Sequence, residues 1–276
     1  MKALPRLTFL GHSTVLIELG GLRVLTDPVL YDRIGPLRRA VTSLDPDLHR
    51  RIDIALVSHL HRDHFDVPSL RLLGPAVQVL VPSGAGPLAA RLGFARSEEL
   101  KPGDSIVSGP VTVTATPAVH GGFRPPFGPN AAAIGYFMEA GDVRIYFAGD
   151  TDLFAGMAEL APGLDVALLP VWGWGPSLGR GHLDPSRAAQ ALRLLRPTFA
   201  VPIHWGTLWP LGFGRVRAGR LTDPPIEFAA LAAQAYPEGT VLVTPPGREV
   251  SYPPQPSPDG PPPRADGVQL EQTQGL

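Results

Sequence analysis

The segment from Val57 to Asp66 reads VSHLHRDHFD and gathers three histidines and two aspartates behind an apolar run that is typical of a β-strand. Alternate residues of an extended chain point the same way, so His59 and His61 can bind one cation. Asp63 and His64 lie beyond the expected turn and can face a neighbouring position. This one segment therefore predicts the start of two metal sites.

Three other segments each place a candidate ligand just beyond an apolar strand: TATPAVHGG with His120, IYFAGDTD with Asp150, and AVPIHWGT with His204. The seven candidate ligands divide between two metals that Asp150 would bridge: His59, His61 and His120 for one, and Asp63, His64 and His204 for the other. A single histidine is more often exposed or satisfied in a core. Nitrogen-rich ligation with carboxylates suits Zn²⁺ first, with Mn²⁺ or Fe²⁺ as alternatives.

Other residues could assist the chemistry. His182, in GRGHLDPS, could donate to a leaving group or a developing oxyanion, or it could simply pack the loop before a helix. Asp63 could orient the attacking hydroxide or accept its proton in addition to binding metal. His12 in FLGHST and Asp27 in LTDP follow strands, where they could hold ligating imidazoles by hydrogen bonds. Asp27 could equally cap the turn made with the following proline.

Aromatic and basic residues near these segments have alternative interpretations. Trp172 and Trp174 in PVWGWGP could wall a substrate cleft, or they could cover the end of the core. Arginine pairs such as Arg38 and Arg39 suit phosphate recognition. Paired arginines in loops are more often a solvated surface, so we do not assign them to the site.

Short strands with few helices must position these residues. Strand-like runs are expected at 7–10, 14–19, 22–26, 54–59, 77–82, 111–117, 132–138, 143–150, 166–172 and 199–205, and helices at 68–73, 87–92, 153–160, 185–195 and 226–235. The clearest helix has Asp184 at its N-cap, Pro185 in its first turn and Pro197 after its end. Strand runs with a few helices in both halves predict two mixed β-layers with helices outside, an α/β sandwich.

Length and composition bound the class of protein. The chain has 276 residues, of which 44% are hydrophobic, enough for one domain over 1–252. The tail, 253–276, is rich in proline and is expected to be disordered. The formal charge is -1, which argues against a nucleic-acid partner, and the absence of cysteine excludes disulfides and thiolate ligands. Neither a signal peptide nor a membrane-spanning stretch is evident, so we expect a cytoplasmic protein.

The sequence resembles the metallo-β-lactamase-fold hydrolases, whose signature H-x-H-x-D-H stands here at 59–64. The resemblance runs from about Leu7 to Val250 and is greatest to the branch of N-acyl phosphatidylethanolamine-hydrolysing phospholipase D and L-ascorbate 6-phosphate lactonase. LTFLGHSTVLIEL, LTDPVL, HLHRDH, FAGDTDLF, GHLDPSRAAQA and PIHWGT carry it. It implies a four-layer αββα sandwich with a dimetal site at one edge of its two sheets.

The resemblance implies a dinuclear-metal hydrolase that uses a metal-bridging hydroxide. A phosphodiester is the favoured substrate because HWGT and HLDP are most similar to the lipase, and a lactone or other cyclic ester is the alternative. Diiron redox proteins of this fold carry an acidic residue where His61 stands. A binding module would usually have lost ligands, and a nuclease would need a basic arm. The partner would be a small molecule or lipid, with Leu208 to Gly214 as a candidate membrane contact; the sequence leaves a homo-oligomer open.

Overall fold

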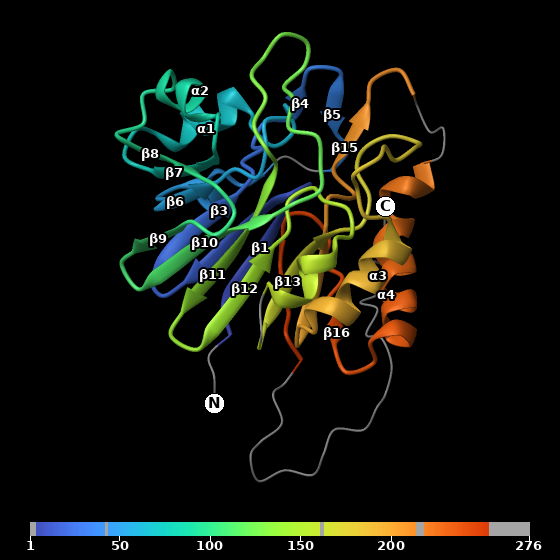
Figure 1. The fold of residues 1–276 in the computed structure, drawn as a ribbon. Coiled ribbons are helices and arrows are strands. Elements are labelled where there is room, and N and C mark those ends of the chain that lie inside the picture. The colour runs from blue at the N-terminus through green and yellow to red at the C-terminus, as the bar shows by residue number, and fades with distance from the viewer. Residues whose placement is uncertain (1–3, 42–43, 161–162, 214–217, 254–276) are drawn as a thin grey trace.

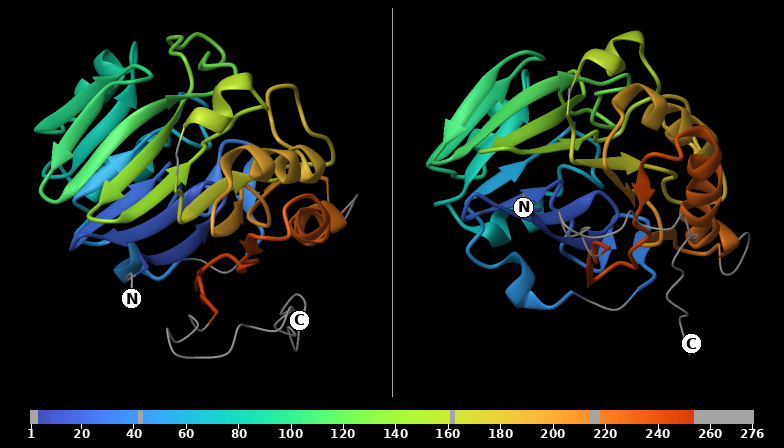
Figure 2. Two further views of the ribbon diagram at one scale, coloured as in Figure 1. Left: turned by 60° about the horizontal axis from the view of Figure 1, so that its bottom comes forward. Right: turned by 90° about the horizontal axis from the view of Figure 1, so that it is seen from below.

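Two seven-stranded sheets lie face to face in the computed structural model of the chain, which describes residues 4–41, 44–160, 163–213 and 218–253 (Figures 1 and 2). The first sheet contains, in spatial order, β17 (Arg248–Glu249), β1 (Arg6–Gly11), β2 (Thr14–Leu19), β3 (Leu22–Thr26), β6 (Ile54–Leu56), β7 (Gln78–Pro82) and β8 (Arg96–Leu100). The second contains β16 (Thr240–Val241), β14 (Phe199–Ile203), β13 (Val166–Pro170), β12 (Val143–Phe147), β11 (Ile134–Ala140), β10 (Val111–Pro117) and β9 (Ser105–Ser108). Strands β3, β6, β7 and β8 run parallel, as do β12, β13, β14 and β16.

Helices cover the outer faces of the two sheets (Figure 1). Helices α1 (Val67–Leu73) and α2 (Gly86–Ala90) lie over the first sheet, and α3 (Pro185–Leu195) and α4 (Asp223–Ala235) lie over the second. A small sheet of β4 (Arg33–Ile34), β5 (Leu37–Arg39) and β15 (Leu208–Pro210) stands beside them. The described part of the chain also contains the 3-10 helices η1 (Pro46–His49), η2 (Ala155–Glu159) and η3 (Ala218–Leu221). The predicted αββα sandwich is confirmed.

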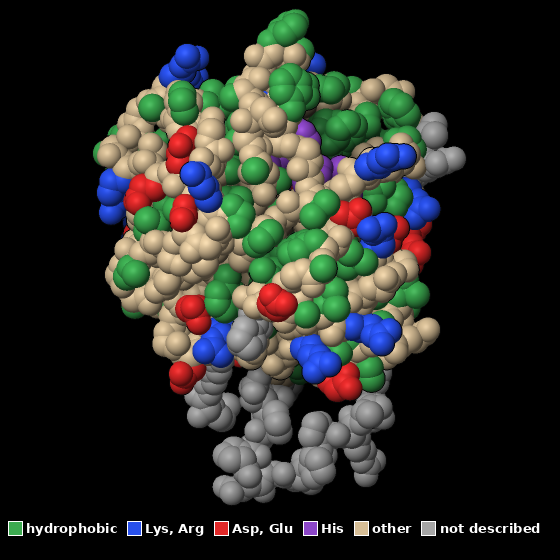
Figure 3. All heavy atoms as spheres, in the orientation of Figure 1, with side chains coloured by type: hydrophobic (Ala, Val, Ile, Leu, Met, Phe, Trp, Pro, Cys, Tyr) green, Lys and Arg blue, Asp and Glu red, His purple; other side chains and the backbone are tan. Residues whose placement is uncertain are grey.

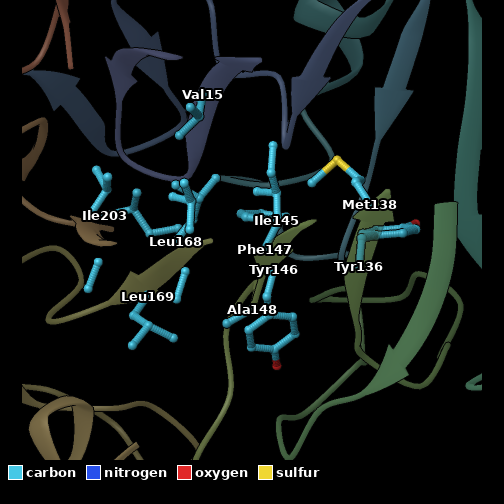
Figure 4. Packing of buried hydrophobic residues seen from close by; sticks show 14 of the residues in the cluster. Val15, Tyr136, Met138, Ile145, Tyr146, Phe147, Ala148, Leu168, Leu169 and Ile203 are labelled. Atoms are coloured by element: carbon cyan, nitrogen blue, oxygen red, sulfur yellow. The ribbon is translucent and has the colours of Figure 1, made fainter. Parts of the chain in front are cut away.

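The main core lies between the sheets. Side chains alternate along a strand, so one face of β12 meets the opposite sheet while the other meets the helices. In Figure 4, Val15 of β2 points toward Ile145 and Leu168, whereas Tyr146 and Leu169 point the other way. A second apolar cluster on the outer face of the first sheet packs against α1 and α2. The strand ends that carry polar residues are therefore held between two packed layers.

Several predicted elements end differently in the structure. The strands expected at 54–59, 143–150, 166–172 and 199–205 stop at 56, 147, 170 and 203, which leaves the histidines and aspartates in the loops that follow. The helix expected at 153–160 is wrong, since that segment contains the 3-10 helix Ala155–Glu159. Helix α4 begins at Asp223, three residues before the expected start at 226. Of the predicted tail, 254–276 lies outside the described residues, and the 1–252 domain boundary stays a prediction.

Tyr136 of β11 connects the second sheet to the first by hydrogen bonds. Its buried hydroxyl lies 2.8 Å from the carbonyl of Val57 and 3.0 Å from that of Leu80, on the first sheet. We expect Tyr136→Phe to lower the free energy of unfolding by about 1–3 kcal/mol, because buried carbonyls lose a donor. Urea unfolding measures the loss. Tyr252→Phe is the control, since that buried hydroxyl has no hydrogen-bond partner among the described residues; equal losses in the two variants would refute the sheet-to-sheet contribution.

Candidate metal centre

The histidine-rich segment leaves the first sheet after β6 and turns sharply. The backbone N–H groups of His64 and Phe65 donate to the carbonyl of His61 at 3.1 and 2.8 Å. This turn separates the ring of His61 from that of His64. His59 and His64 are fully buried, whereas His61 and Asp63 are partly exposed at the surface of the centre.

Three imidazoles converge to form a first cluster. The Nε2 atom of His59 lies 3.0 Å from Nδ1 of His61, which lies 3.1 Å from Nε2 of His120. His120 follows β10 of the second sheet, so the cluster joins the two sheets. Neutral ring nitrogens that converge in this way are ligands that divalent transition metals prefer.

A second cluster lies on the other side of the segment and contains His12, Asp63, His64 and His204. Nε2 of His64 is 3.2 Å from Nε2 of His204, and Nε2 of His12 is 3.0 Å from Oδ2 of Asp63. His204 follows β14, while His12 lies in the turn between β1 and β2. All the histidines except His49 thus belong to these clusters or border them.

Asp150 lies between the two clusters. Its Oδ2 is 3.1 Å from Nε2 of His64, and its Oδ1 is 3.2 Å from Nε2 of His204. The first cluster is close too, with 3.8 Å from Oδ2 to His59 and 4.0 Å to His120. Oδ1 is buried and, within the described residues, has no donor in hydrogen-bonding geometry. An unsatisfied carboxylate oxygen among ring nitrogens is costly without a cation, so the residues fit a metal.

Asp27 lies behind two of these imidazoles and orients them. Its Oδ2 is 2.7 Å from Nδ1 of His64 and also accepts the Ser58 hydroxyl at 2.7 Å, while its Oδ1 accepts the Ser58 N–H at 2.7 Å. The same hydroxyl lies 2.9 Å from Nδ1 of His59. One buried carboxylate therefore keeps the Nε2 atoms of two histidines directed at Asp150.

Backbone carbonyls do the same for the histidines of the second sheet. Nδ1 of His120 donates to the carbonyl of Gly181, and Nδ1 of His204 to that of Trp172, each at 2.7 Å. A hydrogen on Nδ1 leaves Nε2 with a free lone pair. Each of these rings therefore presents an unprotonated nitrogen to the centre.

Electrostatics separates the charged from the neutral groups. Burial alone would raise the pKa of Asp150, but His204 and His64 outweigh it and hold that pKa well below its usual value. Burial would lower the pKa of His64, yet Asp150 and Asp27 raise it well above the ordinary value. Burial lowers the pKa of His59 and of His204. The centre thus combines ionised carboxylates with imidazoles of lowered pKa, as metal binding requires, whereas His64 must release a proton when it binds a cation.

His182 lies at the mouth of the centre. Its Nε2 is 3.5 Å from Oδ2 of Asp150, while Nδ1 lies 3.1 Å from the carbonyls of Gly179 and Arg180. Burial lowers the pKa of His182, but the hydrogen bond and charge of Asp150 outweigh this and raise it. The ring lines a cavity of about 460 Å³ that also includes Trp172. His182 therefore lies within reach of both Asp150 and the cavity.

Some contacts of the centre were not expected from the sequence, although Trp174 was a candidate wall of the cleft. The indole of Trp174 donates to Oδ2 of Asp63 at 2.9 Å and is itself 42% exposed. Gly149 has a φ of +59°, and a Cβ there would lie 2.5 Å from the Cβ of Ser58, so only glycine fits. No local pattern reveals such a contact, because Trp174 is 111 positions from Asp63.

Comparison with known proteins identifies the family of the chain. Residues 22–205 match the model of the Beta-lactamase superfamily domain. The chain belongs to this superfamily. The members of the superfamily that it resembles include a UPF0173 metal-dependent hydrolase of Aeropyrum pernix, 31% identical over 76% of this chain and 86% of the relative. Together with the histidine and aspartate clusters, the match supports a metal-dependent hydrolase of the metallo-β-lactamase fold.

Two further comparisons extend this result. An N-acyl-phosphatidylethanolamine-hydrolyzing phospholipase D 1 of Caenorhabditis elegans is 30% identical over 74% of this chain and 64% of the relative. Among solved structures, the metallo hydrolase Igni18 of Ignicoccus hospitalis matches 91% of this chain and 99% of its own with a TM-score of 0.70 at 22% identity. The structural likeness supports the fold alone.

Proposed function

We propose that the protein is a dinuclear-metal hydrolase that acts on a phosphodiester. The observation that carries the proposal is the position of the Asp150 carboxylate, which lies 3.1 and 3.2 Å from His64 and His204 of the second cluster and 3.8 and 4.0 Å from His59 and His120 of the first. The residues that would hold the ions are, for one, His59, His61 and His120, and for the other, Asp63, His64 and His204, with Asp150 shared. Bound divalent cations, with Zn²⁺ as the first candidate, would supply a water of lowered pKa and a Lewis acid for the oxygen of the electrophile.

Asp63 is assigned two roles, ligation and orientation of the attacking water. Its Oδ2 accepts hydrogen bonds from Nε2 of His12 and Nε1 of Trp174, which fix the plane of the carboxylate. Burial would raise the pKa of Asp63, but His64 and the hydrogen bond from His12 hold it well below the usual value. The ionised carboxylate can therefore accept a hydrogen bond from a water.

His12 is assigned to the support of Asp63 and not to metal binding. Its Nδ1 is buried and has no acceptor among the described residues. Binding a metal through Nε2 would move the hydrogen to Nδ1 and leave a buried donor unpaired, which is costly. The hydrogen therefore belongs on Nε2, where it is donated to Asp63.

His182 is proposed as the donor to the leaving group. We expect His182→Gln to lower kcat for diphenyl phosphate about 10²- to 10⁴-fold, because phenolate needs a proton as it departs. The loss for bis(p-nitrophenyl) phosphate should be much smaller, because p-nitrophenolate leaves unprotonated. Steady-state kinetics on the two diesters tests the role. Equal losses on both would show that His182 only shapes the loop.

Hydrolysis of bis(p-nitrophenyl) phosphate tests the reaction itself. The protein is loaded in turn with Zn²⁺ and Mn²⁺, and chelator-stripped protein is the control. Metal-dependent release of p-nitrophenolate is expected. Hydrolysis of a γ-lactone without any on the diester would overturn the choice of a phosphodiester and identify a lactonase.

Apolar side chains around the opening favour a substrate with a lipid part. Figure 3 shows histidine atoms in a hollow that hydrophobic side chains border on part of its rim. Phe127, in the loop after His120, is 96% exposed, and Leu211 and Phe213 are each 45% exposed. Within the expected contact segment Leu208 to Gly214, Leu208 and Trp209 are buried in the β15 pairing and residues 211–213 are exposed, while Gly214 lies outside the described residues. In the described residues, every helix is too short or too polar to cross a bilayer. Cytoplasmic location and a homo-oligomer stay predictions.

A further inference from the structure

A second cavity, of about 240 Å³, lies beside the histidine-rich turn. Three arginines from three separate segments line it: Arg33 of β4, Arg62 of the turn itself, and Arg124 of the loop after β10. None of the seven proposed metal ligands lines it, so it is separate from the centre. Arg62, however, stands between His61 and Asp63 in the chain. The cavity and the metal centre therefore share one turn of backbone.

Arg124 is held in place from one side. Its Nη1 donates to the carbonyls of Leu60 and Phe65 at 2.7 and 3.0 Å, which are the residues on either side of the turn. Its guanidinium carbon also lies 5.4 Å from the centre of the Phe65 ring. A planar guanidinium fixed through one nitrogen keeps its remaining donors in a set direction at little entropic cost. Arg124 is thus preorganised for a ligand with acceptor oxygens.

Positive charge accumulates here without matching negative charge. Of the charged residues that line the cavity, three are arginines and one is Asp66, a balance of 3 − 1 = +2 in a chain whose net charge is -1. The carboxylate of Asp66 already accepts the N–H and hydroxyl of Ser69. Arg33 donates to the carbonyl of Gly35, and Arg62 makes no hydrogen bond or ion pair with the residues that the structure describes. Guanidinium groups gathered in this way repel one another unless an anion joins them.

We propose that Arg33, Arg62 and Arg124 bind a phosphate group beside the metal centre. Three guanidinium groups that approach from different segments suit a tetrahedral oxyanion, which offers acceptors on several sides, better than a planar carboxylate. The group is either a second phosphate of a soluble substrate or a phospholipid headgroup. This assignment to a substrate rests on the proposed hydrolase function, but anion binding itself does not.

Sulfate, which has the shape and charge of a phosphate dianion, tests the site on the metal-loaded protein. Thermal unfolding is followed against sulfate at constant ionic strength, for wild type, Arg62→Gln, Arg33→Gln and the control Arg91→Gln. Arg91 is exposed and outside the cavity. A saturable rise in Tm is expected, and the sulfate concentration at half effect should increase about tenfold or more in each cavity variant and not in the control. An equal response in all four proteins would overturn the site.

Two further experiments distinguish a phosphate of a soluble substrate from the headgroup of a phospholipid. One compares KM for the p-nitrophenyl ester of thymidine 5′-phosphate with and without a 3′-phosphate; a soluble source predicts a lower KM with the extra phosphate, and loss of that preference in Arg62→Gln. The other measures cosedimentation with phosphatidylcholine vesicles that contain or lack phosphatidic acid; a lipid source predicts binding that needs both the acid and the arginines. Sulfate binding without any turnover would refute only the hydrolase, whereas turnover without arginine-dependent sulfate binding would refute only this site.

Discussion

Replacement of Asp150 by alanine is expected to lower kcat about a thousandfold or more while the chain still folds. Its carboxylate lies between both clusters, with oxygens 3.1 Å from His64 and 3.2 Å from His204 on one side and 3.8 Å from His59 on the other. If Asp150 is shared by two cations as proposed, its loss would remove several kcal/mol of transition-state stabilisation, and each 1.36 kcal/mol is a factor of ten in rate. The side chain makes no contribution to the apolar core.

The measurement is kcat for bis(p-nitrophenyl) phosphate together with bound metal per chain and the urea midpoint. Asp142→Ala is the matched control, because Asp142 is exposed in the hairpin turn before the same strand, β12. The control should keep wild-type metal content and rate. Wild-type kcat in a metal-replete Asp150→Ala protein would contradict a bridging role.

Asp27→Asn is expected to weaken metal binding about 10- to 100-fold. The carboxylate accepts from Ser58 through both oxygens and lies 2.7 Å from Nδ1 of His64, so it can only accept. An amide placed there has one donor end. If the amide NH₂ faces Nδ1 of His64, the imidazole must carry its hydrogen on Nε2 and loses the lone pair that faces the centre. If the NH₂ faces the backbone N–H of Ser58, two hydrogen-bond donors point at each other.

Competition for Zn²⁺ with a chromophoric chelator measures this affinity. Asp53→Asn is the control, since the carboxylate of Asp53 also accepts a backbone N–H, from Arg23, but lies at the start of β6 away from the centre. We expect its zinc affinity to equal that of wild type. An equal loss of zinc affinity in both variants would mean that the affinity falls because the first sheet is destabilised, and not because the tautomer of His64 changes.

Local sequence was sufficient to predict an element where short-range interactions, such as helix capping, determine its ends. Helix α3 spans Pro185–Leu195 as expected, because Asp184 accepts the N–H of Arg187 and Pro197 follows the end. The strands β8, RSEEL, and β9, SIVS, were missed because they are the edges of their sheets, where one face is solvated and the composition is that of a loop. Propensity cannot separate such an edge from a turn.

The metal centre, too, could be predicted only in part from the sequence. The hexapeptide and three strand ends predicted which residues converge, but not the contacts that hold them, such as Trp174 with Asp63. Arg39 is the clearest correction: a solvated surface was favoured, yet its side chain is buried and donates to the carbonyls of Leu10 and Val29. Buried guanidinium groups that serve distant carbonyls leave no periodic signal in a sequence.

The proposed ligands come from both sheets, His59 to His64 from the first and His120, Asp150 and His204 from the second. A cation bound here would therefore act as a cross-link that exists only in the folded chain. Such binding adds about 4 kcal/mol of stability when the free ion is a thousandfold above its dissociation constant. The ion that Asp63, His64 and His204 would bind requires β14 to be in place, because His204 follows that strand. Binding of this ion would therefore be a late step of folding. The lifetime of the protein in a cell would then depend on the supply of metal.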